Sequence, residues 1–169
     1  MSMYQFLASE MMLDGVENPY IEIISVNEAI KRGVNFDESL MNNPSFDRDE
    51  EKILICDTEE HMDEIEINYV GSDSEKCSEG YTELQNIHEL NWCYSEERAQ
   101  KLVDYLKKQI TAGKSAIELW NIWLGETKSA IKKHVKVENL SVSDLELLDV
   151  SSGLTTPICL VVESKGDLK

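Results

Sequence analysis

The sequence is short of positive charge. Its 169 residues include 16 Lys and Arg against 33 Asp and Glu, which gives a net charge of −17. Proteins that bind nucleic acid directly neutralise phosphates with clustered cations, so we expect no direct nucleic-acid partner. The whole excess lies in residues 1–94, which hold 22 Asp and Glu against 5 Lys and Arg, whereas residues 95–169 hold 11 of each.

Long apolar runs are missing as well. No stretch approaches the ~20 apolar residues that a membrane helix needs. Residues 1–7 lack the basic start and long apolar centre of a signal peptide. We therefore expect no membrane partner and a cytoplasmic location. A length of 169 residues is most simply accounted for by a single domain, 1–169.

Motifs that hold metals, cofactors or catalytic groups are absent too. The three histidines have no ligand spacing: His61, His88 and His134. Asp47-x-Asp49-x-Glu51 starts like a calcium loop, but Lys52 stands where glycine is required. No glycine-rich turn predicts a phosphate site, and no Gly-x-Ser-x-Gly elbow occurs. We expect no metal and no cofactor, assign no catalytic residue, and favour binding over enzymatic activity while leaving the latter open.

Cysteine is sparse and scattered. The four cysteines form no Cys-x-x-Cys unit: Cys56, Cys77, Cys93 and Cys159. Three fall within predicted strands, so we expect buried thiols in a reducing cytoplasm rather than disulfides. A Cys77 nucleophile paired with His88 or His61 is disfavoured, because the acids around Cys77 raise a thiol pKa.

A helix over about 95–111 is the clearest element that is present. Ser95 is a suitable N-cap, and Gly113 suits the left-handed residue that closes a helix. One apolar stripe recurs at helical spacing along it: Ala99, Leu102, Val103, Leu106 and Ile110. Such a one-sided helix requires a sheet to pack on.

Several segments supply the strands of that sheet. Residues 116–124 carry apolar side chains on both faces, which predicts an interior strand, and residues 130–137 are expected to pair with it as a lysine-rich hairpin partner near an edge. Other strands are predicted at 3–8, 20–24, 52–56, 64–70, 86–94 and 157–162. The fold class is therefore α+β, a mostly antiparallel sheet of five to seven strands with one long helix on a face and several short helices.

Short helices are indicated by capping patterns. Ser25 to Glu28 and Ser143 to Glu146 both have the spacing of a capping box, and Asp57 or Thr58 can cap a single turn before Met62.

The densest acidic run is the candidate partner-binding site. It contains no Lys or Arg: Asp57, Glu59, Glu60, Asp63, Glu64 and Glu66. Clustered negative charge speeds encounter with positive surfaces and selects them. This pattern suggests a non-catalytic acidic protein-binding domain, such as an inhibitor or immunity-type protein that masks a basic partner. The alternative is an acidic surface that serves solubility alone.

A second alternative is an enzyme or small-ligand-binding domain with its site near loop 71–80 and Trp92. Trp92, Trp120 and Trp123 all lie on the two strands flanking the long helix, where core packing explains them better than a stacking platform for bases. Self-association through an uncovered sheet edge is left open.

Two stretches, residues 18–33 and 92–124, resemble a family of small bacterial proteins that share the strand–helix–strand centre and have no assigned activity. The resemblance implies the central fold and no function.

Overall fold

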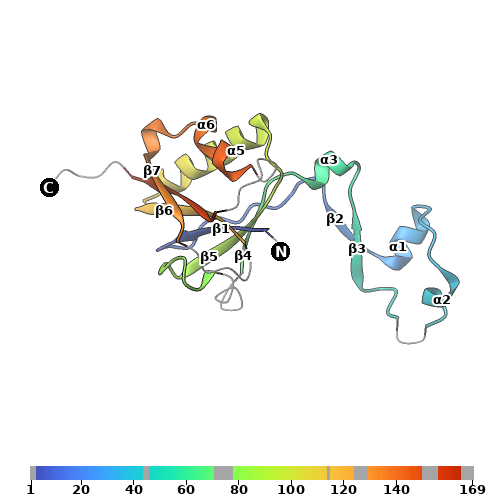
Figure 1. Cartoon of the computed structure of the whole chain (residues 1–169). Coiled ribbons are helices and arrows are strands. Elements are labelled where there is room, and N and C mark those ends of the chain that lie inside the picture. Colours follow the sequence, from blue (N-terminus) through green and yellow to red (C-terminus); the bar gives the residue numbers. More distant parts are fainter. Residues whose placement is uncertain are drawn as a thin grey trace. The chain divides into compact units, whose positions relative to one another are not determined.

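A six-stranded sheet and a separate two-stranded hairpin make this an α+β protein (Figure 1). The computed structural model describes residues 3–43, 46–70, 78–113, 115–123, 129–149 and 156–164. The chain divides into two compact units, one formed by Met1–Glu17 with Glu64–Lys169 and the other by Asn18–Asp63. The expectation of a single domain stays a prediction, because this division does not measure whether either unit folds alone.

The six-stranded sheet belongs to the larger unit, and its strand order is β4-β5-β1-β6-β8-β7. All neighbouring strands are antiparallel except β7 and β8, which are parallel. The strands are β1 (Met3–Ser9), β4 (Glu66–Tyr69), β5 (Asn86–Asn91), β6 (Ala116–Trp123), β7 (Ile131–Lys136) and β8 (Ile158–Glu163). The predicted mostly antiparallel sheet is therefore confirmed.

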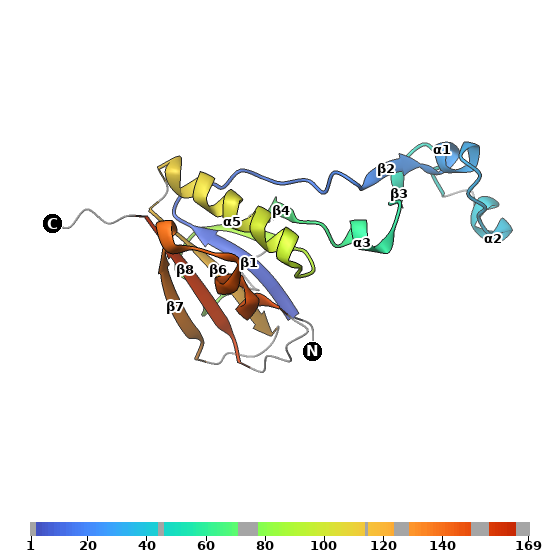
Figure 2. The ribbon, with the colours of Figure 1, turned by 90° about the horizontal axis from the view of Figure 1, so that it is seen from above.

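The helix α5 (Glu96–Thr111) follows the predicted pattern. Ser95 caps it by accepting a hydrogen bond from the Arg98 amide at 3.2 Å, and Gly113 follows with a φ of 99°. The whole predicted stripe is buried against the sheet. Seen from above, α5 and the short helix α6 (Val142–Leu145) overlie the strands (Figure 2). Helical periodicity thus predicted both the helix and its buried face.

Strand β6 is interior, as its two-sided apolar pattern predicted. Ile117 and Leu119 join the core beneath α5, while Trp120 and Ile122 join a second apolar cluster on the opposite face. Tyr81 and Leu84, which precede β5, pack on that second face, and it is the more aromatic of the two. Phe6 stacks on Trp120 with ring centroids 6.0 Å apart.

Two local predictions about the end of the chain were wrong. Residues 130–137 form no hairpin with β6, because β8 lies between β6 and β7 and pairs with both. The predicted edge position of this lysine-rich strand is confirmed. Helix α6 is capped by Ser141, which forms a capping box with Asp144 and not one from Ser143 to Glu146. The short 3-10 helices η2 (Val137–Asn139) and η3 (Glu146–Leu148) flank α6.

In its described residues, the smaller unit consists of a two-stranded antiparallel sheet and three short helices. Its elements are β2 (Glu22–Ser25), α1 (Val26–Lys31), α2 (Glu38–Met41), β3 (Glu51–Ile55) and α3 (Glu59–Met62). Ser25 caps α1 and Thr58 caps α3, each through its hydroxyl oxygen. We call this unit, Asn18–Asp63, the hairpin unit.

No helix within the described ranges is both long and apolar enough to cross a membrane.

Candidate functional site

The hairpin unit exposes a pair of large apolar side chains. Ile23 on β2 lies opposite Leu54 on β3, and their side chains are 56% and 48% exposed. Neighbouring Ile24, which points to the other side of the strand, is 5% exposed. A half-buried hairpin normally places polar residues on its outer face. The apolar pair therefore marks this outer face as a surface suited to contact with another molecule.

The strands of this hairpin also have open edges. Within the part of the chain that the structure describes, β2 and β3 pair only with each other. An unpaired strand edge presents backbone N–H and C=O groups that another extended segment can use.

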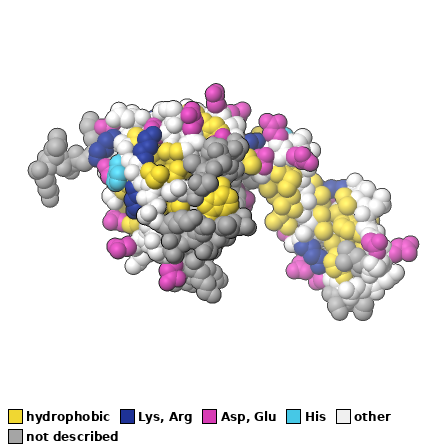
Figure 3. Space-filling model, in the orientation of Figure 1, with side chains coloured by type: hydrophobic (Ala, Val, Ile, Leu, Met, Phe, Trp, Pro, Cys, Tyr) yellow, Lys and Arg dark blue, Asp and Glu magenta, His cyan; other side chains and the backbone are white. Residues whose placement is uncertain are grey.

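The hairpin unit holds more carboxylates than its cations can neutralise. It contains twelve Asp and Glu against four Lys and Arg. Arg32 donates to Glu22 at 2.7 Å and to Glu28 at 3.3 Å, and these contacts hold the pKa of both carboxyls below its usual range. Lys52 contacts Glu50 at 3.0 Å. Hydrophobic and acidic side chains share the visible face of this unit (Figure 3).

Four of the six predicted partner-binding residues lie in this unit. Asp57, Glu59 and Glu60 are exposed around the start of α3, and Asp63 is partly exposed just after that helix. The other two, Glu64 and Glu66, belong to the larger unit. The division falls between Asp63 and Glu64, so the action of all six as one surface stays a prediction.

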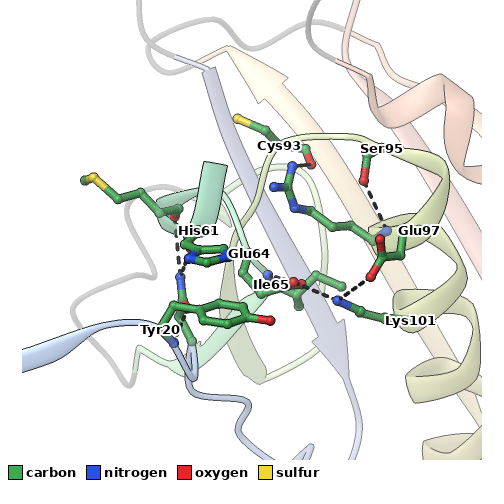
Figure 4. A network of polar contacts seen from close by, with 11 residues as sticks. Tyr20, His61, Glu64, Ile65, Cys93, Ser95, Glu97 and Lys101 are labelled. Carbon is green, nitrogen blue, oxygen red and sulfur yellow. Dashed lines mark hydrogen bonds and ion pairs between the residues drawn. The ribbon is translucent and has the colours of Figure 1, made fainter. Parts of the chain in front are cut away.

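Glu64 forms an ion pair with a lysine of the same unit. Lys101 on α5 donates to its carboxylate at 2.7 Å and also contacts Glu97 at 3.2 Å (Figure 4). Burial is the largest influence on the pKa of Glu64 and raises it. The hydrogen bonds from Lys101 and the Ile65 amide, together with the nearby positive charges, outweigh burial, so the pKa lies below its usual value. The Glu64 side chain is only 11% exposed. Its charge therefore contributes little to an outward-facing surface, in contrast with Glu59.

The two ends of the hairpin unit are joined by a buried amide. Asn18, 6% exposed, donates to the backbone oxygen of His61 at 2.8 Å and accepts from the Tyr20 amide at 2.9 Å. The rings of Tyr20 and His61 stack with centroids 3.9 Å apart, as the side-by-side rings in Figure 4 show. These contacts tie the start of the hairpin unit to α3 near its end, so its two ends are held together although few of its residues are buried.

A pocket opens on the aromatic face of the six-stranded sheet, in the larger unit. It has a volume of about 540 Å³ and is lined by residues 80–84, Glu118 on β6 and Lys132 on β7. Tyr81 meets Trp120 edge to face at 5.6 Å. The size falls within the range of small-ligand sites.

Glu118 holds two donors beside this pocket. Its Oε2 accepts from the Trp120 indole nitrogen at 2.8 Å, and its Oε1 accepts from Lys132 Nζ at 3.3 Å. The same Lys132 ammonium lies 4.9 Å from the centre of the Trp120 ring. The side chain of Glu118 is 15% exposed, while that of Lys132 is 44% exposed. Burial, followed by the Glu118 charge, raises the pKa of the neighbouring Cys159 thiol to about 12.

The described parts of the predicted alternative site near loop 71–80 and Trp92 lie on opposite faces of the sheet. Residues 71–77, Cys77 among them, lie outside the described residues, while Gly80 lines the pocket. Trp92 lies just past the end of β5, not within a strand as predicted, and packs on the α5 side. There its indole donates to Gln5 at 2.7 Å. Trp92 is therefore a structural residue on the far side of the sheet from the pocket.

The expectation of buried thiols holds for Cys159 and is wrong for Cys93, which is exposed; Cys56 is partly exposed. Cys93 lies in the connection between β5 and α5, outside the strand predicted to bury it. Across the described ranges, no group of three or more His, Cys, Asp or Glu could hold a metal ion. Sequence reasoning missed Glu118 and Lys132, because they are fourteen positions apart in the sequence and an intervening strand separates them in the sheet.

No family model, no curated protein and no solved structure matches this chain. The resemblance to small bacterial proteins accordingly stays a prediction.

Proposed function

We propose that this protein acts by binding, not catalysis, and that the hairpin unit docks a basic protein partner. Inhibitors and immunity-type proteins that mask a cationic protein have this character. The observation that carries the proposal is the exposed Ile23–Leu54 pair on a hairpin whose unit has twelve acids against four bases. The thiols of Cys56 and Cys159, which form no disulfide, support a reducing cytoplasm as its setting.

Each half of this surface has a separate role in the proposal. The apolar pair supplies area that loses water on contact, which is the main source of affinity in protein association. The surplus carboxylates, including Asp57, Glu59 and Glu60, accelerate encounter with a cationic surface and select against acidic ones. Such a partner combines apolar and positively charged side chains on one contact face.

Solubility alone would explain the acids but not the apolar pair. An acidic coat improves solubility when exposed large apolar residues are few, and cross-strand Ile and Leu on an open hairpin work against it. The combination therefore favours docking over a purely solubilising surface.

The test is affinity capture from the native cell at low salt, with the captured proteins identified and then purified for direct binding measurements. The expected partner is basic, and its binding weakens on raising salt to ~0.5 M, where surface charges are strongly screened. Two variants should weaken binding: I23T/L54T, which removes the apolar pair, and E59K/E60K, which reverses two charges.

The matched control is E138K/E146K, which changes net charge equally at exposed positions in the larger unit. Equal losses for E59K/E60K and this control would show that only net charge matters. Binding unaffected by salt and by I23T/L54T would overturn the proposal.

A further inference from the structure

The pocket on the aromatic face already holds an ammonium group, which is that of Lys132. Its Nζ lies 3.3 Å from the Glu118 carboxylate and 4.9 Å from the centre of the Trp120 ring. A carboxylate beside an aromatic face is the arrangement that binds organic cations, through charge pairing and cation–π attraction together. The Lys132 side chain therefore shows which chemistry this position accepts.

The charge of the lining favours the same class of ligand. Two carboxylates, Glu83 and Glu118, line the pocket against the single ammonium of Lys132. If Lys132 swings away, the described charged groups of the lining are all negative. The net charge of −17 adds a background field that attracts cations and repels anions.

From this geometry we infer a second binding site, one that takes a primary alkylammonium group, with Glu118 as its carboxylate and the Trp120 ring, which the Lys132 ammonium now covers, as its aromatic partner. Lys132 acts as an internal competitor that occupies the site when no ligand is present. This inference is independent of the hairpin unit and of its proposed partner.

Exchange of the ammonium groups is physically easy. Lys132 lies on the edge strand β7, and its side chain is 44% exposed, so the ion pair with Glu118 is only weakly held. Its flexible stem can turn to solvent without disturbing the sheet. Trp120 is only 1% exposed and lies under the Lys132 ammonium, so turning Lys132 to solvent uncovers the part of the ring that this ammonium now covers. Figure 3 shows the Lys and His side chains gathered at this edge of the larger unit.

Glu118 serves the site in two ways. It supplies the negative charge, and its second oxygen fixes the Trp120 indole at 2.8 Å. E118Q removes the charge but keeps an oxygen that accepts from the indole, so it separates ligand recognition from the packing of Trp120. Glu118 thus offers a clean test.

The experiment is a titration of the full-length protein with 1,5-diaminopentane, followed by the indole N–H resonance of Trp120. We expect a saturable shift in the wild-type protein, roughly tenfold tighter binding in K132A, where the competitor is gone, and loss of binding in K132A/E118Q. Lys133, the next residue, points to the other face and pairs with Asp144. K133A is therefore the matched control and should bind as the wild type does.

Pentanoate, a chain of the same length with the opposite charge, should produce no saturable shift. A lysine peptide with blocked ends distinguishes the ligand's source: tighter binding than the diamine identifies a protein side chain, and weaker binding a free amine. Equal affinity of K132A and K132A/E118Q, or no binding by K132A and the wild type, would overturn the inference. The wild-type titration needs no substitution, so it holds even if a variant folds poorly.

Discussion

Ile23 and Leu54 lie directly opposite each other across the β2–β3 hairpin, and each exposes about half of its side chain, at 56% and 48%. One position along β2, Ile24 is 5% exposed. Side chains of successive strand residues point to opposite faces, so these neighbours of identical type occupy opposite environments. Ile24 therefore supports the fold, while Ile23 is exposed as the proposed docking role requires.

This contrast predicts different stabilities for matched substitutions. I23T/L54T should change the free energy of unfolding by no more than ~0.5 kcal/mol, because little burial is lost and threonine suits strands. I24T should cost at least ~2 kcal/mol, since it removes buried methyl groups and buries a hydroxyl. Urea unfolding followed by circular dichroism measures both. Equal costs would mean that Ile23 and Leu54 support the fold.

A second prediction concerns the buried amide of Gln5. Its nitrogen donates to the Leu148 backbone oxygen at 2.8 Å, and its oxygen accepts from the Trp92 indole at 2.7 Å. Q5L leaves both partners unsatisfied and should cost about 1–3 kcal/mol in unfolding free energy.

The cost of Q5L should be smaller when Trp92 is already phenylalanine, because one of the two orphaned groups is then absent. Q100L, on the exposed face of α5, is the control and should be nearly neutral. A full-sized cost of Q5L in the W92F background would argue against the indole contact.

A third prediction is the pH dependence due to Glu64. Its pKa is below its usual value in the folded protein, so it adds stability above its ordinary pKa and loses that contribution as pH falls through the folded value. K101M removes the hydrogen bond and the charge of Lys101 and leaves only the Ile65 amide and Arg98 to oppose burial, so the pKa of Glu64 rises. Acid unfolding of K101M should therefore begin at higher pH than that of the wild type.

At neutral pH the loss in K101M should stay below ~1 kcal/mol, because Lys101 is well exposed and solvent screens the pair. K107M, on the same helix, provides the comparison. An acid transition in K101M that coincides with that of K107M would contradict the role of the Lys101–Glu64 pair.

A fourth prediction ranks the described cysteines by reactivity. Cys93 is exposed and should react first with iodoacetamide, with Cys56 slower. Cys159 should react last, since burial raises its pKa to about 12 and keeps the reagent out. Timed alkylation with peptide mass spectrometry gives the order, and all three should react at similar rates in denaturant. Rapid labelling of Cys159 in the folded protein would show that the aromatic face opens.

Local sequence patterns predicted the helix and strands of the larger unit well. They did not predict which strands pair when those strands are distant in sequence. Periodicity identified α5 and the two-sided burial of β6, because each depends on residues close in sequence. The prediction of a hairpin between 116–124 and 130–137 was wrong because β8, which begins twenty-one residues after position 137, inserts between the two strands. Only the competition among buried strands decides that order.

The candidate sites were harder still to predict. The acidic run at Asp57 to Glu66 is plain in the sequence, yet the division after Asp63 leaves no mark there, since no glycine- or proline-rich linker accompanies it. The contact of Glu118 with Lys132 depends on both residues facing the same side of a sheet across an intervening strand. Spacing along the chain carries no signal for such a contact.

The chain leaves the larger unit after Glu17 and re-enters it at Glu64. The backbones of Val16 and Ile67 form a reciprocal pair of hydrogen bonds, at 3.0 Å and 2.8 Å, that ties these two segments together within that unit. A short turn joining Glu17 to Glu64 would therefore preserve β1 and β4 in their places. We therefore expect that the forty-six residues between them can be exchanged or diverge in sequence while the six-stranded sheet keeps its structure.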